Sequence, residues 1–395
     1  MNKTKKTIKV GGDNLITLCI TALLLFGTLM IASAEMGSQA GNIKATGMVL
    51  FKQIVYVVLG FAAMKFCSRF DFLAFKKSVF NTGALVACGL LLACLAFPST
   101  NGANAWIYIG PFSIQPAEFI KVYSLMYLAK FFSVGYRNRD EEKLNFIRVG
   151  IMILLWVLII LVFQRDTGSC AVLVVMSYIG FIINLRPSIA KLQNGMFYFM
   201  MFVGVFGAFF LVSPFFINFL ASLDTDYYAV SRFIAFANPF KYKYDIGYHL
   251  VMSLVSLANG GLIGTGFGSS IHKYMNFPNQ SNDFILSIIV EELGFVGFLG
   301  IIIPYTIIVV RLARYALSKY ADARTRIILI GTIMMLLSHF IFNVGGISGF
   351  IPLTGVPLLL VSSGGSSTVA FLIAIGLCQY EIKRINRKKA EERCA

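Results

Sequence analysis

The chain has 395 residues, of which 57% are hydrophobic and only 13% charged, with a formal net charge of +16. Soluble proteins carry roughly a quarter charged residues, so this composition excludes an ordinary soluble domain and predicts an all-α polytopic membrane protein. The seven cysteines form no CxxC pair and the three histidines lack metal-binding spacing, which argues against a disulfide framework and a histidine-built metal site.

Ten apolar segments recur along the chain, most of them near the roughly 17 to 25 residues that cross a bilayer. We expect about ten transmembrane helices, at about 15–34, 50–66, 79–97, 116–134, 149–164, 169–185, 196–219, 284–310, 327–347 and 356–379. No internal repeat, low-complexity linker or soluble domain is evident, so residues 1–395 are interpreted as one integral membrane domain.

The first segment has some features of a cleaved signal peptide. Four lysines precede it, and Ala32-Ser33-Ala34 resembles a signal-peptidase site. The segment is longer than an ordinary signal-peptide core, however, and nine further spans follow it. We therefore expect a retained first helix after a short tail at residues 1–14.

Lysine and arginine are distributed unequally between alternate connections. One side of the predicted membrane collects 25 of the 34, whereas the short loops opposite hold only Lys44, Lys52 and Arg165. By the positive-inside rule both termini are cytoplasmic, including the tail at residues 381–395. Topology and attraction to anionic lipid headgroups explain the net charge, and no nucleic-acid partner is expected.

The connection at residues 220–283, between the seventh and eighth predicted spans, is by far the longest and is expected outside the cell. Loops of this length are usually functional. Its cations and aromatic rings suit an anionic ligand with a headgroup, although interfacial anchoring explains them equally well; they are Arg232, Lys241, Lys243, Lys273, Tyr227, Tyr228, Tyr242, Tyr244 and Tyr248. The glycines at 264, 266 and 268 follow no βαβ pattern, which favours a close-packing loop over a nucleotide site.

Ionisable residues within apolar segments are functional candidates, because they cost several kcal/mol unless they are paired or face water. Glu118 and Lys121 stand at i and i+3 in the fourth segment, so they can pair on one helix face. Arg165 and Asp166 lie at the outer end of the fifth segment, where a structural ion pair is an equally good explanation.

Three carboxylates stand at the start of the eighth segment. Asp283 immediately precedes the apolar run, and Glu291 lies about 12 Å deeper along a helix. Glu291 and Glu292 point about 80° and 180° away from Asp283, so the three cannot line one site. Asp283 is therefore expected at the water boundary, and the two glutamates are expected to connect neighbouring helices or line an inner cavity.

Four longer motifs carry a resemblance to a known family. They are "NGANAWIYIGPFSIQPAEFIKV", "FQRDTGSC", the stretch from "NPFKYKYDIGYH" to "NQSNDFILSIIVEELGFVG", and "GFIPLTGVPLLLVSSGGSS". In this order they resemble the signatures of the SEDS family (shape, elongation, division and sporulation), which contains the RodA, FtsW and SpoVE proteins. The division-type FtsW members are the most similar.

This resemblance implies an enzyme, a peptidoglycan glycosyltransferase that polymerises lipid II at the outer face of the bacterial cytoplasmic membrane, in cell division or shape maintenance. It also implies binding of undecaprenyl-linked glycan, cooperation with a class B penicillin-binding protein, and association with other divisome or elongasome membrane proteins.

The resemblance also assigns roles to residues at matching motif positions. The family's essential aspartate corresponds to Asp283 and its tryptophan to Trp106. Its glutamate and lysine pair corresponds to Glu118 and Lys121, and a further aspartate to Asp166. The family usually has proline, histidine, threonine and tyrosine at the positions of Arg165, Ser281, Asn282 and Ser363. These departures remove no carboxylate, but the missing histidine argues against an imidazole beside the base.

The implied reaction deprotonates the 4-hydroxyl of an acceptor sugar as it attacks an anomeric carbon, with undecaprenyl diphosphate as the leaving group. A carboxylate at the water boundary suits a general base, so Asp283 is predicted to be catalytic. Arg232, Lys121 and the loop lysines, including Lys273, are candidates to neutralise the diphosphate. A divalent cation, Mg or Mn, is a further candidate, with Asp283 as its ligand and no organic cofactor. Trp106 is expected to pack on a sugar face or to anchor the chain at the interface.

Two other functional classes fit parts of the sequence. Buried charges and Gly/Pro-interrupted spans are compatible with a transporter (flippase) for a lipid-linked saccharide, although the internal repeat of many transporters is missing. A non-catalytic divisome scaffold is the other alternative. Glycan polymer from lipid II, and its loss in Asp283→Asn, separates the enzyme from both.

Overall fold

The computed structural model describes residues 11–38, 42–100, 102–133, 135, 138–184, 186, 189–213, 215, 228–275, 277 and 279–394. Within these residues the chain is mainly helical and contains one antiparallel hairpin, β1 (Ile107–Ile109) and β2 (Phe112–Ile114). The helices of the bundle are α1 (Asn14–Ser38), α2 (Ile43–Cys67), α3 (Lys77–Ala93), α4 (Pro116–Phe132), α5 (Arg139–Leu158), α6 (Thr167–Ile182), α7 (Ala190–Val212), α11 (Ile285–Ala316), α12 (Ala323–Ile347) and α13 (Gly365–Cys394). Two further helices, α9 (Tyr228–Ala237) and α10 (Tyr248–Gly260), lie in the long connection before α11.

Seven of these helical segments are long and apolar enough to cross a membrane. They are α1, α2, α3, α5 with the π-helical turn that follows it, α11, α12 and α13, and α6 is a shorter apolar helix. The fold class, an all-α polytopic membrane protein, is thereby confirmed. Each of the ten predicted segments overlaps a helix, whereas a total of ten spans stays a prediction.

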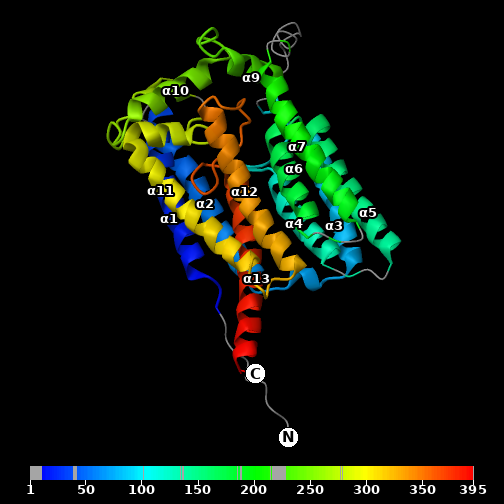
Figure 1. Ribbon diagram of the computed structural model, residues 1–395. Helices are drawn as coiled ribbons and strands as arrows, with labels where there is room; N and C mark the ends of the chain where they lie inside the picture. The colour runs from blue at the N-terminus through cyan, green and yellow to red at the C-terminus, as the bar shows by residue number, and fades with distance from the viewer. Residues whose placement is uncertain are drawn as a thin grey trace.

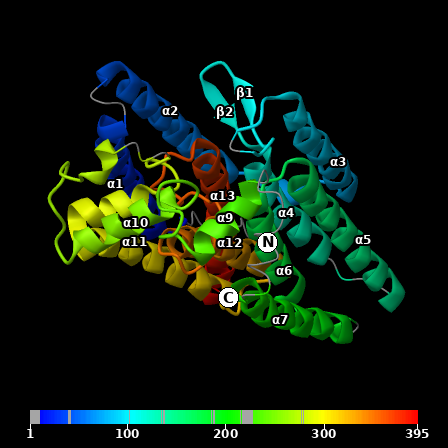
Figure 2. The same cartoon turned by 90° about the horizontal axis from the view of Figure 1, so that it is seen from above.

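The bundle has two groups of helices with a central pair between them. In Figure 1, α1 and α11 stand on one side and α3, α5 and α7 on the other, with α12 and α13 between them; Figure 2 shows the same grouping from above. Helix α13 packs along α2, and α12 packs along both α6 and α4. The two central helices therefore contact both groups, and residues from both sides can meet above them.

Small residues permit the close contacts of the central helices. A Cβ on Gly376 in α13 would stand 2.6 Å from the carbonyl oxygen of Met64 in α2, and one on Gly331 in α12 would stand 2.2 Å from Leu125 in α4. Helices within a membrane gain little from a hydrophobic driving force, so close packing at small residues is a main source of their association. These glycines let α13 and α12 approach their neighbours.

Helix α11 contains a break just after its two glutamates. Gly294 has φ 64° and ψ −159°, which is not helical. The loop that follows α10 occupies the interruption, because the amides of Thr265 and Gly266 donate to the carbonyls of Glu291 and Glu292 at 2.9 Å. A Cβ on Gly264 would lie 2.2 Å from the Glu292 carbonyl oxygen. The predicted close-packing role of this glycine-rich loop is therefore confirmed.

The last predicted segment, 356–379, begins too early. Residues 352–364 form an irregular stretch inside the bundle, and α13 starts only at Gly365. Two prolines, at 352 and 357, interrupt regular helix formation, and Gly355 and Leu360 have φ values of 70° and 65°. We refer to residues 352–364 as the central loop. At its other end, α13 continues to Cys394, so most of the predicted C-terminal tail at 381–395 is helical.

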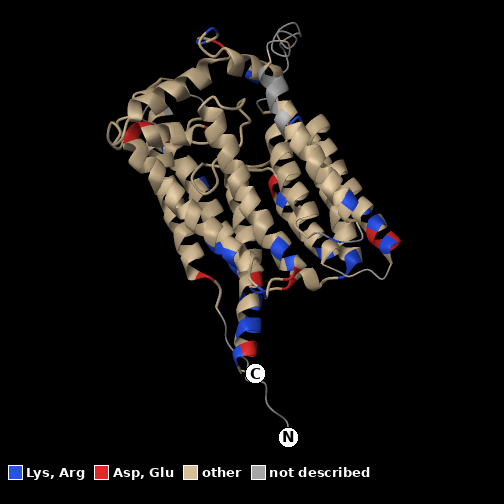
Figure 3. Ribbon diagram, in the orientation of Figure 1, with Lys and Arg blue, Asp and Glu red and all other residues tan. Residues whose placement is uncertain are grey.

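Lysine and arginine gather at the end of the bundle where α1 begins and α13 ends (Figure 3). Several are paired there: Arg324 contacts Asp71 at 2.5 Å and Glu381 at 2.7 Å, and Arg384 contacts Asp322 at 2.9 Å. Helices α9 and α10 lie at the opposite end of the bundle (Figure 1). The fold therefore separates a basic end from an end that carries the long connection.

Candidate active site

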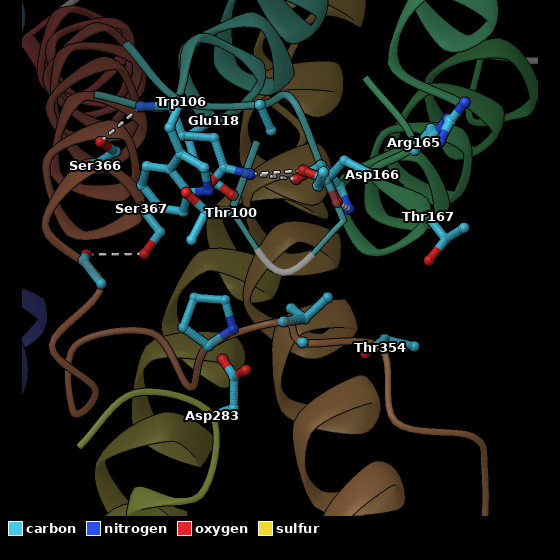
Figure 4. Close-up of a pocket in the computed structure, with 18 of the residues that line it drawn as sticks. Thr100, Trp106, Glu118, Arg165, Asp166, Thr167, Asp283, Thr354, Ser366 and Ser367 are labelled. Carbon is cyan, nitrogen blue, oxygen red and sulfur yellow. Dashed lines mark hydrogen bonds between the residues drawn. The ribbon is translucent and has the colours of Figure 1, made fainter. Parts of the chain in front are cut away.

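A cavity of about 680 Å³ lies among the hairpin, α4, the junction between α5 and α6, α9, the start of α11 and the central loop. Its lining includes the predicted site residues Trp106, Glu118, Asp166, Arg232 and Asp283. Figure 4 shows the Asp283 carboxylate reaching toward the middle of this space, with Trp106 and Glu118 on the facing wall. Residues separated by up to 177 positions in the chain are thus brought into one polar cavity.

Asp283 is held by its backbone at the start of α11. Its amide donates to the carbonyl of Asn279 at 3.0 Å, in a turn where Asn279 has φ 53°. Its carbonyl accepts a hydrogen bond of 2.8 Å from the side-chain amide of Asn343. The side chain is different: among the residues that the structure describes, its buried Oδ1 has no hydrogen-bond partner. The backbone is therefore fixed while one carboxylate oxygen is left for a ligand.

The electrostatic surroundings of Asp283 suit a proton acceptor. Burial away from water raises the pKa of Asp283 to about 6; the Arg232 guanidinium opposes this rise and the Asp166 carboxylate adds to it. A carboxyl group with this pKa is mainly ionised at neutral pH, yet it is a stronger base than an ordinary aspartate.

Arg232 approaches Asp283 across Gly355 of the central loop. A Cβ on Gly355 would stand 3.2 Å from both terminal guanidinium nitrogens of Arg232 and 3.6 Å from Oδ2 of Asp283. Arg232 also donates from Nη1 to the Leu353 carbonyl at 3.1 Å. Because Gly355 has no side chain, a cation and a carboxylate can both reach the same part of the cavity.

Glu118 and Lys121 form the ion pair that their spacing predicts. Lys121 Nζ donates to Glu118 Oε1 at 2.7 Å, and both residues are at most 1% exposed. Glu118 lines the cavity, whereas Lys121 lies behind it and does not belong to the lining. Lys121 therefore supports Glu118 rather than facing the cavity itself.

Asp166 has a local structural role as well as a place in the cavity wall. Its Oδ1 accepts from the amide of Ser169 at 2.9 Å and so caps α6, which satisfies one of the free amides at the helix start. Its Oδ2 accepts from Nε2 of Gln115 at 2.6 Å. Arg165, which has φ 57°, also lines the cavity. Both carboxylate oxygens of Asp166 are thus engaged within the protein.

Trp106 is half-buried in the lining, just before strand β1. The hairpin beside it is tied to the start of α13 and to α2, because Gln115 donates its amide to Ser366 Oγ at 3.0 Å and Tyr56 donates to the Ser113 carbonyl at 2.9 Å. This position is compatible with a ring that packs on a bound sugar.

Lys273, predicted to bind substrate, lies elsewhere. It is 1% exposed, its Nζ contacts Glu292 Oε1 at 2.7 Å and Ser33 Oγ at 3.0 Å, and it is not part of the cavity lining. That prediction is therefore corrected: Lys273 ties the loop to α1 and α11. Its charge is neutralised by the buried glutamate, which the loop sequence alone could not reveal.

Glu291 and Glu292 connect neighbouring segments, as their angular positions on the helix indicated. Glu291 accepts from Ser270 Oγ and pairs with His272 Nδ1, both at 2.6 Å, and Glu292 pairs with Lys273. Neither glutamate lines the cavity. Of the other loop residues, Lys241, Lys243 and Tyr244 are exposed, and Tyr227 lies outside the described residues.

Several cavity residues were not predicted because they carry no charge. Gln115 orients Asp166, and Asn282 Oδ1 and Thr354 Oγ1 are buried at the lining without a hydrogen-bond partner in the described part of the chain. Gln115 lies within the first family-like motif and Thr354 within the last. Their place in motifs was the available signal, but only the fold brings them to the cavity.

The residues present offer a limited donor set for a divalent cation. Across the described ranges there is no group of three or more His, Cys, Asp or Glu residues that could hold a metal. Asp283 Oδ1, Asn282 Oδ1 and Thr354 Oγ1 are nevertheless oxygen atoms of the type that Mg²⁺ and Mn²⁺ prefer. These three oxygen atoms are therefore the donors that the described cavity lining offers to a cation.

Comparison with known proteins agrees with the motifs. The family model described as "Cell cycle protein", for FtsW, RodA and SpoVE, matches residues 13–388. Stage V sporulation protein E of Bacillus subtilis is 28% identical over 94% of this chain and 97% of its own. A probable peptidoglycan glycosyltransferase FtsW from Geobacter metallireducens is 30% identical over 92% and 93% of the two chains. The peptidoglycan glycosyltransferase RodA of Treponema pallidum is 30% identical over 92% and 96%.

Solved structures have the same fold. A chain from the study entitled "Structural coordination of polymerization and crosslinking by a peptidoglycan synthase complex" has a TM-score of 0.68 and 24% identity, and covers 95% of this chain and 99% of its own. The rod shape determining protein RodA of Thermus thermophilus has a TM-score of 0.60 and 23% identity, and covers 93% and 96%. Since the family model spans nearly all of the sequence, the chain belongs to the FtsW/RodA/SpoVE family of cell cycle proteins.

Proposed function

We propose that this protein is a peptidoglycan glycosyltransferase that polymerises lipid II into glycan strands. Family membership and the names of relatives with up to 30% identity over almost the whole chain support this activity. The single observation that carries the chemistry is the Asp283 carboxylate, which faces a cavity of about 680 Å³ with one oxygen that has no partner among the described residues.

In the proposed mechanism Asp283 is the general base. It accepts the proton of the acceptor sugar's 4-hydroxyl while that oxygen forms a bond to the anomeric carbon of the donor. The bond from that carbon to undecaprenyl diphosphate breaks, and its electron pair leaves with the diphosphate. Attack from the face opposite the leaving group inverts the anomeric carbon, so no covalent sugar intermediate on a carboxylate is needed.

The leaving group needs charge neutralisation more than protonation. Arg232 presents its guanidinium nitrogens beside Gly355, on the cavity wall and near Asp283, and guanidinium pairs well with phosphate oxygens. A divalent cation, when bound, would supply further neutralisation through the oxygen atoms of Asp283, Asn282 and Thr354. Trp106 and Glu118 are proposed to contact the sugars, and Asp166 to maintain the wall through Gln115 and Ser169.

We further propose that both termini are cytoplasmic and that the cavity opens to the outer face of the bacterial inner membrane. The supporting observation is the gathering of Lys and Arg at the end of the bundle where α1 begins and α13 ends (Figure 3). A class B penicillin-binding protein is the proposed partner. Its support is the fold shared with a chain of a peptidoglycan synthase complex.

The test uses the full-length protein, purified with its cognate class B penicillin-binding protein and supplied with lipid II. Wild type is expected to make glycan polymer, and Asp283→Asn is expected to make none. Asp140→Asn, a change to an exposed carboxylate at the start of α5, is the matched control and is expected to keep full activity. Wild-type polymer from Asp283→Asn would remove Asp283 as the base.

One observation favours the transporter as a second candidate. Helix α11 is interrupted at Gly294 inside the bundle, and interrupted helices are common at the binding sites of transporters. In vesicles that contain lipid II, translocation without any polymer would support that candidate, whereas polymer formation supports the enzyme.

A further inference from the structure

Helix α12 carries two buried polar residues one turn apart. His339 is 0% exposed and Asn343 is 3% exposed. Residues at i and i+4 project from the same helix face and are separated by about 6 Å along the axis. Neither residue lines the cavity, but both bond to residues that do. They therefore form a second layer behind its wall.

Asn343 connects the start of α11 to the central loop. Its side-chain Nδ2 donates to the Asp283 carbonyl at 2.8 Å and to the Val356 carbonyl at 3.0 Å. An amide nitrogen has two hydrogens, so both are used here. The backbone of Asp283 is thus connected to Val356, the neighbour of Gly355. Gly355 is the residue at which Asp283 and Arg232 approach each other.

His339 makes the corresponding connection toward Glu118. Its Nδ1 lies 3.0 Å from the Pro357 carbonyl oxygen, and its Nε2 lies 3.3 Å from Lys121 Nζ. A carbonyl can only accept a hydrogen bond and an ammonium can only donate one. Nδ1 must therefore carry the hydrogen and Nε2 the lone pair, which defines a neutral imidazole in one tautomer. Lys121 in turn donates to Glu118 at 2.7 Å.

The two residues bind consecutive carbonyls of the central loop, those of Val356 and Pro357. From these two carbonyls, hydrogen bonds lead through Asn343 to Asp283. A second series leads through His339 and Lys121 to Glu118. We infer that His339 and Asn343 are positioning residues that set the separation of the Asp283 and Glu118 carboxylates across the cavity. This inference rests on the proposed function, because it assigns these residues to the geometry of that reaction.

The position of His339 also matters directly for Glu118, because His339 Nε2 lies 3.9 Å from Glu118 Oε2. Glu118 Oε2 and Asp283 Oδ1 are buried and have no hydrogen-bond partner in the part of the chain that the structure describes. Asp283 and Glu118 both line the cavity, so a ligand that spans it would contact both residues. A displacement of about 1 Å between reacting groups can lower a rate about 100-fold even when the changed residue lies far from the chemistry.

The experiment compares two substitutions of His339 in the lipid II polymerisation assay. His339→Gln keeps one acceptor and one donor, so it can bond both Lys121 and Pro357; His339→Leu can bond neither. We expect kcat to fall about 10- to 100-fold in the leucine variant, with KM within about threefold of wild type. We expect the glutamine variant to restore kcat to within about threefold of wild type.

The matched control is Thr332→Val on the same helix. Thr332 is 0% exposed and contacts Cys378 Sγ at 3.3 Å, away from the cavity lining. This change removes a buried polar contact without touching the connections to Asp283 and Glu118. The kcat of Thr332→Val is expected to stay at the wild-type value even if its melting temperature falls as much as that of His339→Leu.

A second variant covers the case in which His339→Leu does not fold. Asn343→Ala removes both connections to Asp283 and Val356, and it is expected to lower kcat about 10- to 100-fold. If both single variants fold, their losses are expected to be less than multiplicative in the double variant, because both act on one separation.

The outcomes separate this inference from the proposed function. A folded His339→Leu with wild-type kcat, or a glutamine variant as impaired as the leucine variant, would overturn the positioning role. If His339→Leu does not fold, wild-type kcat in Asn343→Ala overturns it. Full activity in Asp283→Asn would instead overturn the base assignment, and the leucine and glutamine comparison would still report on His339.

Discussion

Arg232 and Asp283 meet over the bare α-carbon of Gly355, with the guanidinium and the carboxylate both within 3.6 Å of the point where a side chain would begin. The glycine is thus a requirement of the site as well as of the backbone, whose φ there is 70°. Because Arg232 and Asp283 both approach Gly355, a substitution of this glycine tests their arrangement without changing either charged residue.

Substituting this glycine should impair activity by crowding. Gly355→Ala puts a methyl group 3.2 Å from two nitrogens of Arg232, and the left-handed backbone adds about 1–2 kcal/mol of strain. We expect at least about a tenfold lower polymerisation rate. Gly110→Ala is the control, since Gly110 has φ 57° but open space around its α-carbon. It carries the same strain without crowding, so equal activities of the two variants would contradict the explanation.

The pH dependence of the reaction follows from the surroundings of Asp283. Burial raises its pKa to about 6, and a general base must be deprotonated to act. The kcat/KM for lipid II should therefore be level above this pH and fall about tenfold for each unit below it. Initial rates measured from about pH 5 to pH 8 would reveal the bend. A flat profile through this range would exclude Asp283 as the titrating base.

The same shift predicts how stability changes with pH. The pKa of Asp283 is higher in the folded protein than its ordinary value of 3.8, so ionisation disfavours the folded state. This destabilisation begins as pH rises past the ordinary value and is complete above the folded value of about 6. Asp283→Asn should therefore melt at a higher temperature than wild type at neutral pH, with the difference disappearing toward pH 4. Equal melting temperatures at both pH values would contradict it.

Local patterns in the sequence predicted relationships between residues that are close together in the chain. The spacing of Glu118 and Lys121 predicted their ion pair, which the structure confirms at 2.7 Å. The helical angle between Asp283 and Glu291 predicted that they serve different sites, and Glu291 indeed pairs with His272 outside the cavity. The first prediction succeeded because it depends on the geometry of a single helix, and the second because Asp283 lies only two residues before the start of α11.

Contacts between residues that are far apart in the chain could not be predicted from the sequence. An apolar run with glycine and proline at 356–364 looked like the start of a span, yet it folds as an irregular loop against α12. Nothing in the sequence singled out His339 and Asn343, because their partners are 13 to 218 positions away. Lys273 belongs to the cations of the long loop and was therefore a substrate candidate, and the loop sequence could not show that Glu292 of α11 is its partner.

The corrected role of Lys273 makes its own prediction. Lys273 and Glu292 form a buried pair at 2.7 Å, and removing one partner of such a pair costs about 3–5 kcal/mol because a charge is left buried. Lys273→Met should therefore lower the melting temperature markedly, and adding Glu292→Met should recover much of the loss. The KM for lipid II should not change in the folded variants. A raised KM at an unchanged melting temperature would restore Lys273 to the substrate site.

The orientation of the bundle can be tested with the chain's own cysteines. Cys394 is exposed at the end of α13, and the other six cysteines are buried or half-buried. If the basic end faces the cytoplasm, a membrane-impermeant maleimide should label Cys394 in inverted vesicles and not in intact cells with a permeabilised outer layer. Leu262 is 75% exposed in the loop after α10, so Leu262→Cys in a Cys394→Ser background should give the reverse pattern. Labelling of Cys394 from outside would mean that the cavity faces the cytoplasm. Asp283 could not then act on a substrate presented at the outer face.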